Sequence, residues 1–326
     1  RLLSWVMVLV LCLALLPVGA LAAGKVASGT CGDNLTWTLD SDGVLTISGT
    51  GKMSWFSVCP WNDKKDAIVS VVIEFGVKDV RDEAFEFLSG LKTVTISSSV
   101  MSIGKNAFFG CSGLESFTVD ARNRAYASVD GILFDKDKTT LLQYPAAKTA
   151  ESYAIPDGVT AIGKGAFRDC TALTGVTIPG TVVSIGDYAF SSCSALKDVM
   201  LPDSVTSIGE NAFLYSGYAN TFSNRDDNLV LYLGNWLLDA SFYGVSSSFA
   251  IREGTVGIAD GAFYNVSGLK ELTVPNSVKT IGNRACQGCE NLTSVTIGSG
   301  AESIGNYAFW SCKNLKSIKP GSGLKC

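Results

Sequence analysis

The chain has 326 residues and a formal net charge of −4. A negative net charge argues against nucleic-acid binding and offers no basic face to an anionic lipid surface. The sequence contains no histidine, which removes imidazole acid–base catalysis, the Ser–His and Cys–His nucleophile pairs and the commonest zinc ligand. We therefore expect a protein that is not an enzyme and that holds no cofactor and no metal.

Residues 1–22 have the pattern of a secretory signal peptide. An apolar run that ends at Leu16 is followed by Pro17 and by the small residues Ala20 and Ala22, which form a small-x-small cleavage site. A transmembrane anchor is the alternative, but it needs about 20 apolar residues, more than this run offers before its proline. We therefore expect a secreted or cell-surface protein with no membrane insertion after cleavage.

Residues 23–66 precede the repeats described below and are expected to form an N-terminal capping block. Two stretches with alternating apolar residues, 35–39 and 44–47, flank the sequence Asp-Ser-Asp-Gly, which predicts a β-hairpin. A solenoid needs such a cap over its first core layer. Cys31 and Cys59 both lie in this block and form the candidate disulfide pair.

The remainder, residues 67–326, is dominated by a repeat built around the dipeptide Ala-Phe, which becomes Ala-Cys in one copy. Most copies are 23 residues apart, and two wider gaps, of 59 and 50 residues, point to insertions near 120–152 and 217–248. Self-similarity at a fixed period of this length indicates a solenoid. The repeat alanines are Ala84, Ala107, Ala166, Ala189, Ala212, Ala262, Ala285 and Ala308.

Each unit contains two extended pieces and a compact turn. The alternation of Val176 and Ile178 has the period of a strand, and Gly186 permits the turn after a second, shorter extended piece. Ala189 and the residues after it fit one helical turn that packs inward. A single unit cannot bury enough apolar surface to offset its loss of chain entropy, so the units must stack. We expect one continuous parallel sheet of strands near 68–73, 91–96, 114–119, 173–178, 196–201, 269–274, 292–297 and 315–319.

The stretch Leu173-x-x-Val176-x-Ile178, followed by Ile185-Gly186-x-x-Ala189-Phe190-x-x-Cys193, resembles the BspA-like leucine-rich repeats of bacterial secreted and cell-surface proteins. The resemblance implies a β-rich solenoid, a leucine-rich-repeat horseshoe or arc. A parallel sheet would form one face, short strands and helical turns the other, and a β-hairpin the N-terminal cap. It also implies a non-catalytic adhesion protein with a protein or glycan partner outside the cell. A structural spacer in a longer surface protein is the alternative, and a glycan-active enzyme is a weaker one.

The two insertions differ in composition. In the first, near 120–152, apolar segments flank Asp135-Lys136-Asp137-Lys138, which predicts a hairpin that leaves the stack. The second, near 217–248, is rich in aromatic residues, which either pack the insertion or form an exposed platform for a protein or glycan. The candidate ligand-binding residues of this platform are Tyr215, Tyr218, Phe222, Tyr232, Trp236, Phe242 and Tyr243.

Five cysteines share one inward position of the repeat, where Leu88 and Val266 stand in other copies, and we expect them to act as small buried hydrophobes. The last repeat, from Leu315, lacks its second half, so we expect the chain to be artificially cut at its C-terminus. The cysteines of this position are Cys111, Cys170, Cys193, Cys289 and Cys312.

Overall fold

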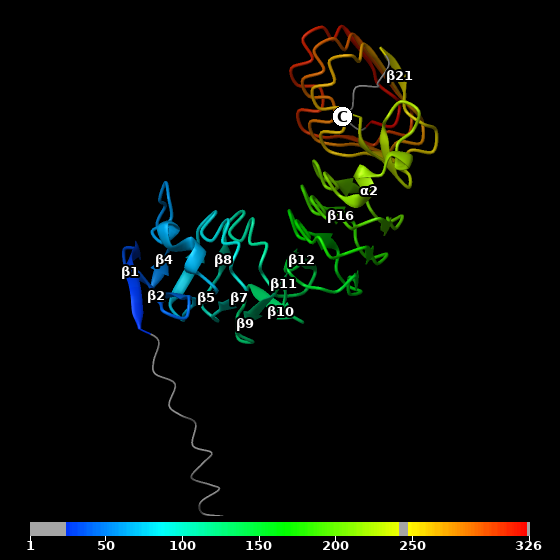
Figure 1. Ribbon diagram of the computed structural model, residues 1–326. Helices are drawn as coiled ribbons and strands as arrows, with labels where there is room; N and C mark the ends of the chain where they lie inside the picture. Colours follow the sequence, from blue (N-terminus) through cyan, green and yellow to red (C-terminus); the bar gives the residue numbers. More distant parts are fainter. Residues whose placement is uncertain (1–23, 241–246, 325–326) are drawn as a thin grey trace, which may run out of the picture.

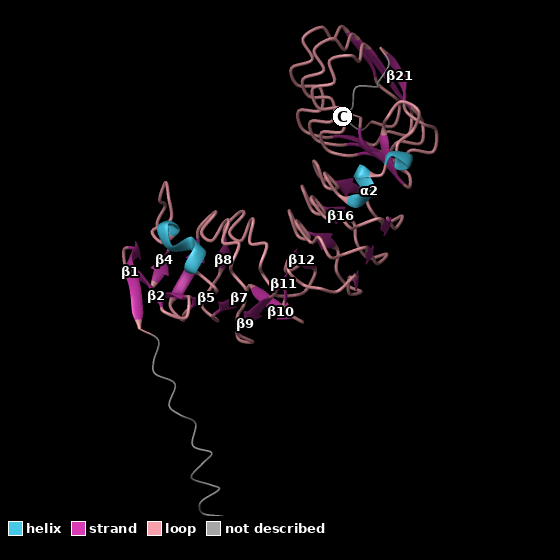
Figure 2. Ribbon diagram, in the orientation of Figure 1, coloured by secondary structure: helices cyan, strands magenta, loops and turns pink. Residues whose placement is uncertain are grey.

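The computed structural model describes residues 24–240 and 247–324, and the predicted signal peptide, residues 1–22, lies outside them. The described chain winds into a stack of turns that follows a bent arc (Figure 1). Strands and turns dominate (Figure 2), and no helix in the described ranges is long and apolar enough to cross a membrane. The helical elements are the 3-10 helices η1 (Asn62–Ala67) and η2 (Phe222–Asn224) and the α-helix α2 (Gly217–Asn220).

The N-terminal block contains the predicted hairpin and one further strand. Strands β1 (Lys25–Gly32), β2 (Leu35–Asp40) and β3 (Val44–Gly49) pair antiparallel in chain order. Strand β3 then pairs parallel with β5 (Ser70–Ile73), the first repeat strand. The block is therefore part of the same sheet as the first repeats, and its buried residues belong to the same hydrophobic core.

Each regular repeat contributes a longer strand, and these strands pair parallel with partners 23 positions away, as Ser70 does with Thr93. The prediction of one continuous sheet is nevertheless wrong, because the longer strands form three separate sheets. The first continues β1, β2, β3 and β5 with β7 (Thr93–Ile96) and β9 (Ser116–Val119). The second contains β13 (Ser152–Ala154), β15 (Gly175–Thr177) and β17 (Asp198–Met200). The third contains β21 (Ser248–Ala250), β23 (Glu271–Val274), β25 (Ser294–Ile297) and β27 (Ser317–Lys319).

A second row of shorter strands runs along the stack and is likewise divided into three sheets. The first contains β4 (Gly51–Lys52), β6 (Val77–Val80) and β8 (Ser102–Ile103). The second contains β14 (Ala161–Ile162), β16 (Ser184–Ile185) and β18 (Ser207–Ile208). The third contains β22 (Gly257–Ile258), β24 (Thr280–Ile281) and β26 (Ser303–Ile304).

The insertions cause these interruptions. The first forms β10 (Tyr126–Val129), β11 (Ile132–Asp135) and β12 (Thr140–Gln143), and β12 pairs parallel with β14. The second forms β19 (Leu231–Leu233) and β20 (Trp236–Asp239), and β20 pairs parallel with β22. The first insertion therefore contains the predicted hairpin, but this hairpin joins the stack instead of leaving it. We call β10–β12 the first joint and β19–β20 the second joint.

The joints connect three separate hydrophobic cores through alternate side chains of one strand. In β11, Leu133 packs into the N-terminal core, whereas its neighbours Ile132 and Phe134 pack into the middle core. Adjacent residues of a strand point to opposite faces, so one strand serves both cores. At the second joint Trp236 belongs to the middle core and Leu237 to the C-terminal core. We call the parts on either side of the joints the N-terminal, middle and C-terminal segments.

The compact turn around Ala-Phe is not the helical turn that we expected. Two residues of each such loop, for example Tyr188 (φ 55°) and Ser192 (φ 60°), lie in the left-handed region, which no right-handed helix accommodates. The N–H groups of Tyr188, Phe190 and Ser192 instead donate to carbonyls of the next loop, at 3.0, 2.7 and 2.8 Å. We call this loop-to-loop hydrogen bonding the turn ladder. It aligns the repeat phenylalanines, and the ring centroids of Phe167 and Phe190 lie 4.9 Å apart.

Candidate functional site

The structure separates the seven aromatic residues that were candidates for ligand binding. Trp236 and Tyr232 are 4 % and 5 % exposed, so their interpretation as an exposed platform is wrong. Their rings fill the cores on the two sides of the second joint. Tyr218 is half-buried, and its hydroxyl donates to the carbonyl of Tyr232 at 2.7 Å. Phe242 and Tyr243 lie outside the described residues.

Tyr215 and Phe222 are the two candidates with exposed side chains, at 64 % and 74 %. Tyr215 borders a cleft of about 310 Å³ beside the second joint. Arg225 and Asp239 line the same cleft and form an ion pair at 3.2 Å, in which the Arg225 side chain is 8 % exposed. The charges of this cleft are therefore largely matched within it.

The candidate disulfide is not formed, because Cys31 and Cys59 are both free thiols. The Cys59 thiol donates to the carbonyl of Ala84 at 3.2 Å and lies 3.6 Å from a guanidinium nitrogen of Arg81. Cys31 is buried on β1 in the N-terminal core. Burial raises the pKa of the Cys31 thiol to about 11. Four of the five cysteines at the shared repeat position are buried as predicted, namely Cys111, Cys170, Cys193 and Cys289, whereas Cys312 is half-buried.

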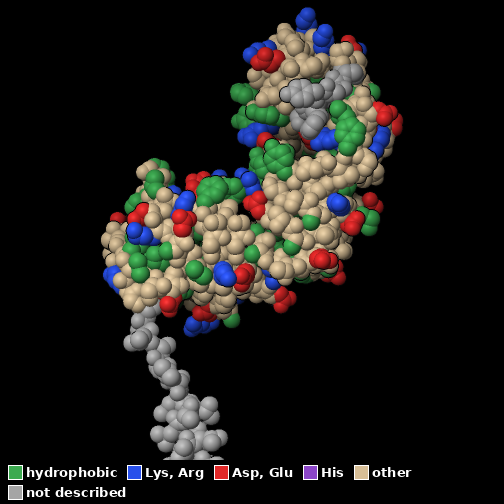
Figure 3. Space-filling model, viewed as in Figure 1, with side chains coloured by type: hydrophobic (Ala, Val, Ile, Leu, Met, Phe, Trp, Pro, Cys, Tyr) green, Lys and Arg blue, Asp and Glu red, His purple; other side chains and the backbone are tan. Residues whose placement is uncertain are grey.

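A cleft that the sequence did not reveal lies at the first joint. It has a volume of about 260 Å³, and its walls come from the last loop of the N-terminal segment, from β12 and from the first loops of the middle segment. The surface is notched between these two segments (Figure 3). The hydroxyl of Tyr126 accepts a hydrogen bond of 2.8 Å from the N–H of Ile103, which ties the joint to the N-terminal wall. Burial raises the pKa of this tyrosine.

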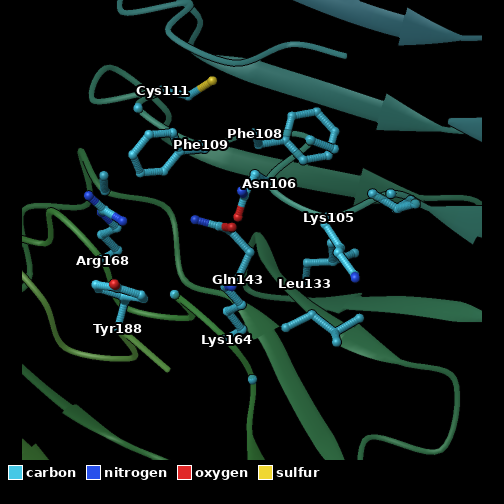
Figure 4. A pocket seen from close by; sticks show the side chains of 18 of the residues that line it. Lys105, Asn106, Phe108, Phe109, Cys111, Leu133, Gln143, Lys164, Arg168 and Tyr188 are labelled. Atoms are coloured by element: carbon cyan, nitrogen blue, oxygen red, sulfur yellow. The ribbon is translucent and has the colours of Figure 1, made fainter. Parts of the chain in front are cut away.

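Arg168 is clamped between aromatic rings from both walls of this cleft. Its guanidinium carbon lies 4.1 Å from the ring centroid of Phe109 and 5.4 Å from that of Tyr188, and Figure 4 shows it between these two rings. Such contacts are favourable because the face of an aromatic ring attracts a cation. A guanidinium that lies over a ring face can still donate hydrogen bonds from its edge, which carries its N–H groups.

One donor of Arg168, the Nε of its guanidinium, is not used within the described part of the chain. Its Nε is buried and has no hydrogen-bond partner. The nearest carboxylate oxygen, on Asp169, lies 3.8 Å from Nε, which is too long for a hydrogen bond. A buried donor without an acceptor is costly, so an arriving acceptor would be stabilised here.

Two further cations and two amides surround the same space. Lys105 and Lys164 are exposed at the cleft, and the side-chain amides of Asn106 and Gln143 meet in its middle (Figure 4). With Arg168 there are three cationic side chains, and Asp169 is the one carboxylate among the described lining residues. This excess of positive charge among the lining residues of a net negative protein suits an anion.

Phe109 and Arg168 occupy the same position of the repeat, directly after the repeat phenylalanine. In a regular stack this position faces its equivalent 23 residues away, but here the two residues are separated by the first insertion. Sequence reasoning assigned no role to this position, because it followed only the residues that recur at the repeat period. The aromatic and cationic residues on the two sides of the wider gap were the available signal.

Comparison with known proteins agrees with this architecture. The chain matches the family model described as BspA type leucine rich repeat region over residues 63–130, 146–229 and 238–326. No curated protein matches the sequence significantly.

Several solved structures match the chain. A leucine-rich repeat protein from Eubacterium ventriosum is 23 % identical over 92 % of this chain and 87 % of its own, with a TM-score of 0.30. The pneumococcal vaccine antigen PcpA is 18 % identical over 92 % and 88 %, with a TM-score of 0.41. A leucine rich cell surface protein from Faecalibacterium prausnitzii is 22 % identical over 90 % and 95 %, with a TM-score of 0.34. Because the family model spans well over half of the sequence, the chain belongs to the BspA-type leucine-rich repeat family.

Proposed function

We propose that this protein is a non-catalytic binding protein of the bacterial surface or exterior, and that the cleft at the first joint receives a carboxylate group of its ligand. The observation that carries the proposal is the clamped Arg168, whose buried Nε has no hydrogen-bond partner. The signal-peptide pattern of residues 1–22 supports an exterior location. The description of the Faecalibacterium relative as a cell surface protein supports it as well.

The chemistry of the cleft favours a carboxylate over a neutral ligand. An arginine presents donors in a planar fork that matches the two oxygens of a carboxylate. Lys105 and Lys164 add charge at the mouth and would speed the encounter with an anion. Both acidic polypeptides and glycans with uronic acids carry such groups, so the two ligand classes form separate arms of the test.

The test measures binding of two probes, a short blocked peptide in which glutamate alternates with threonine and an oligogalacturonate. At least one should bind, and its affinity should fall with added salt because the contacts are charged. Arg168→Gln should raise its Kd roughly tenfold, the loss expected for one hydrogen bond to a charged group. Arg124→Gln is the matched control, because Arg124 is an exposed arginine outside the cleft. Equal affinity of the two variants would contradict the proposal, and so would the absence of binding by both probes.

A further inference from the structure

The turn ladder is interrupted at the first joint, and the interruption lies inside the cleft. Where repeats stack regularly, the loop that begins at Gly165 donates its N–H groups at 165, 167 and 169 to the carbonyls of 187, 189 and 191. The equivalent N–H groups before the joint belong to Asn106, Phe108 and Gly110. All three residues line the cleft, and their N–H groups have no acceptor within the described ranges.

The insertion restores one side of the ladder but not the other. The N–H of Tyr144, which follows β12, donates to the carbonyl of Ala166 at 2.7 Å, as a repeat phenylalanine would. The Tyr144 ring also stacks on Phe167, with centroids 5.2 Å apart. The insertion therefore supplies a donor to the loop after it, whereas the loop before it receives no carbonyls. Buried main-chain donors are almost always paired in folded proteins, and Phe108, the middle residue of the row, is buried. The row of three is therefore an open main-chain edge.

The spacing of the row defines what can pair with it. Its donors lie on alternate residues, and in the regular stack their acceptors are carbonyls of alternate residues of another main chain. An extended polypeptide presents carbonyls at that interval, and addition of a peptide to an open main-chain edge is a common mode of recognition. A glycan has no such regular series of carbonyl groups.

We infer that the cleft at the first joint binds an extended segment of an acidic polypeptide. Alternate carbonyls of this segment accept from the N–H groups of Asn106, Phe108 and Gly110, and a carboxylate side chain reaches Arg168. The inference rests on the proposed function and names its ligand class. In effect the ligand takes the place of the loop that the insertion displaced.

The second joint has an equivalent row of three main-chain N–H groups, but the cleft beside it lacks the excess of cations. The N–H groups of Asn211, Phe213 and Tyr215, which border the cleft there, also have no acceptor among the described residues. Arg225 of that cleft, however, is paired with Asp239. Lys164 and Arg168 of the first cleft also have carboxylates 3.8 Å away, on Asp187 and Asp169. The two clefts thus share a main-chain edge, and the excess of cations over carboxylates that line the first one favours an acidic segment.

Amide hydrogen exchange resolved to single residues by NMR tests the inference on the intact chain. With the Glu/Thr peptide at about 100 times its Kd, exchange of the Asn106, Phe108 and Gly110 amides should slow by up to about 100-fold, because exchange then requires peptide release. The amides of Phe85 and Phe167 are internal controls, since both already donate to the next loop. Their exchange should stay the same.

The outcomes separate this inference from the proposed function. Peptide binding that depends on Arg168 and leaves the three amides unprotected would overturn the main-chain pairing and retain the carboxylate site. Oligogalacturonate that protects the three amides as strongly as the peptide would overturn the assignment to a polypeptide. If neither probe binds, both proposals fail together. Protection of the three amides by the peptide alone is the expected result.

Discussion

The thiol of Cys193 donates a hydrogen bond of 2.9 Å to the main-chain carbonyl of Phe167, one turn earlier in the stack. The same bond recurs from Cys111 to Phe85 at 3.1 Å and from Cys289 to Phe263 at 3.0 Å. These thiols are buried, and each adds a side-chain donor to the hydrogen bonds between turns while it fills the space of a small apolar side chain. A weak donor at this position therefore links consecutive turns.

Replacement of Cys193 should separate these two roles. Cys193→Val keeps the bulk and loses the donor, and we expect it to lower the free energy of unfolding by about 1 kcal/mol. Cys193→Ala also leaves a cavity and should cost about 1–3 kcal/mol more than the loss of the bond alone. Urea denaturation followed by circular dichroism measures both. A valine variant as stable as the parent protein would show that the thiol acts through its volume alone.

Stability should fall at alkaline pH because several thiols are harder to ionise in the folded chain. Burial raises the pKa of Cys111 to about 12 and that of Cys312 to about 11, from an ordinary value of 9.0. Below pH 9 these thiols are protonated in both states and contribute no pH dependence. Above it the unfolded chain releases its protons first, so the free energy of unfolding decreases as the pH rises toward the folded values.

Urea midpoints measured at pH 7, 9 and 10.5 would follow this decline. Cys111→Val removes one titrating group, and its stability should fall less steeply over the alkaline part of the range. A midpoint that stays constant above pH 9 would mean that the buried thiols ionise as easily in the folded chain as in the unfolded one.

Of two nearby glycines, Gly186 and Gly180, only the first should lose stability when a methyl group is added. Gly186 has no positive φ, so it is not required for the turn as the sequence suggested. A Cβ there would lie 2.7 Å from the main-chain nitrogen of Lys164, and neighbouring turns could not stack as closely. Gly186→Ala should cost about 1–3 kcal/mol through this overpacking.

Gly180 is the matched control for that substitution. A Cβ on Gly180 meets no atom within 4 Å, so Gly180→Ala should change stability by about 0.5 kcal/mol or less. Thermal unfolding of the two alanine variants compares them directly. Equal melting temperatures would show that the stack can adjust to the methyl group at Gly186.

The stability cost of replacing an aromatic residue in the second insertion should depend on how far that residue is buried. Trp236 packs over Gly257, where even a Cβ would meet the ring at 2.5 Å, and Trp236→Ala should cost about 3–5 kcal/mol. Phe222 is exposed, and Phe222→Ala should stay within about 0.5 kcal/mol of the parent chain. Chemical denaturation distinguishes the two, and a similar stability for both variants would place Trp236 outside the core.

The repeat itself was predictable from the sequence because its apolar residues are fixed by the period of the stack. Val176 and Ile178 on a strand face, or Phe190 and Cys193 in a loop, are buried in every equivalent position where one core continues. Periodicity determines such positions without knowledge of the neighbours. The candidate site could not be found in this way, because Phe109 and Arg168 meet across a break in the period.

The sequence of the first insertion already indicated a strand that is buried on both faces. Ile132, Leu133 and Phe134 are consecutive apolar residues, and all three are buried. A strand covered on both faces has this uninterrupted pattern, whereas a hairpin at the surface alternates. The run thus indicated a strand between two cores. Which cores it joins depends on the tertiary arrangement, and no local pattern specifies that.

The division of the sheets at the joints also bears on how the chain folds. In an unbroken solenoid, a nucleus formed in any repeat can spread, because each completed strand is a template for the next. Here the templates end at β9 and β17, the last strands of their sheets. Each segment must therefore nucleate for itself, and damage to one segment should leave the hydrogen-exchange protection of the other two largely intact.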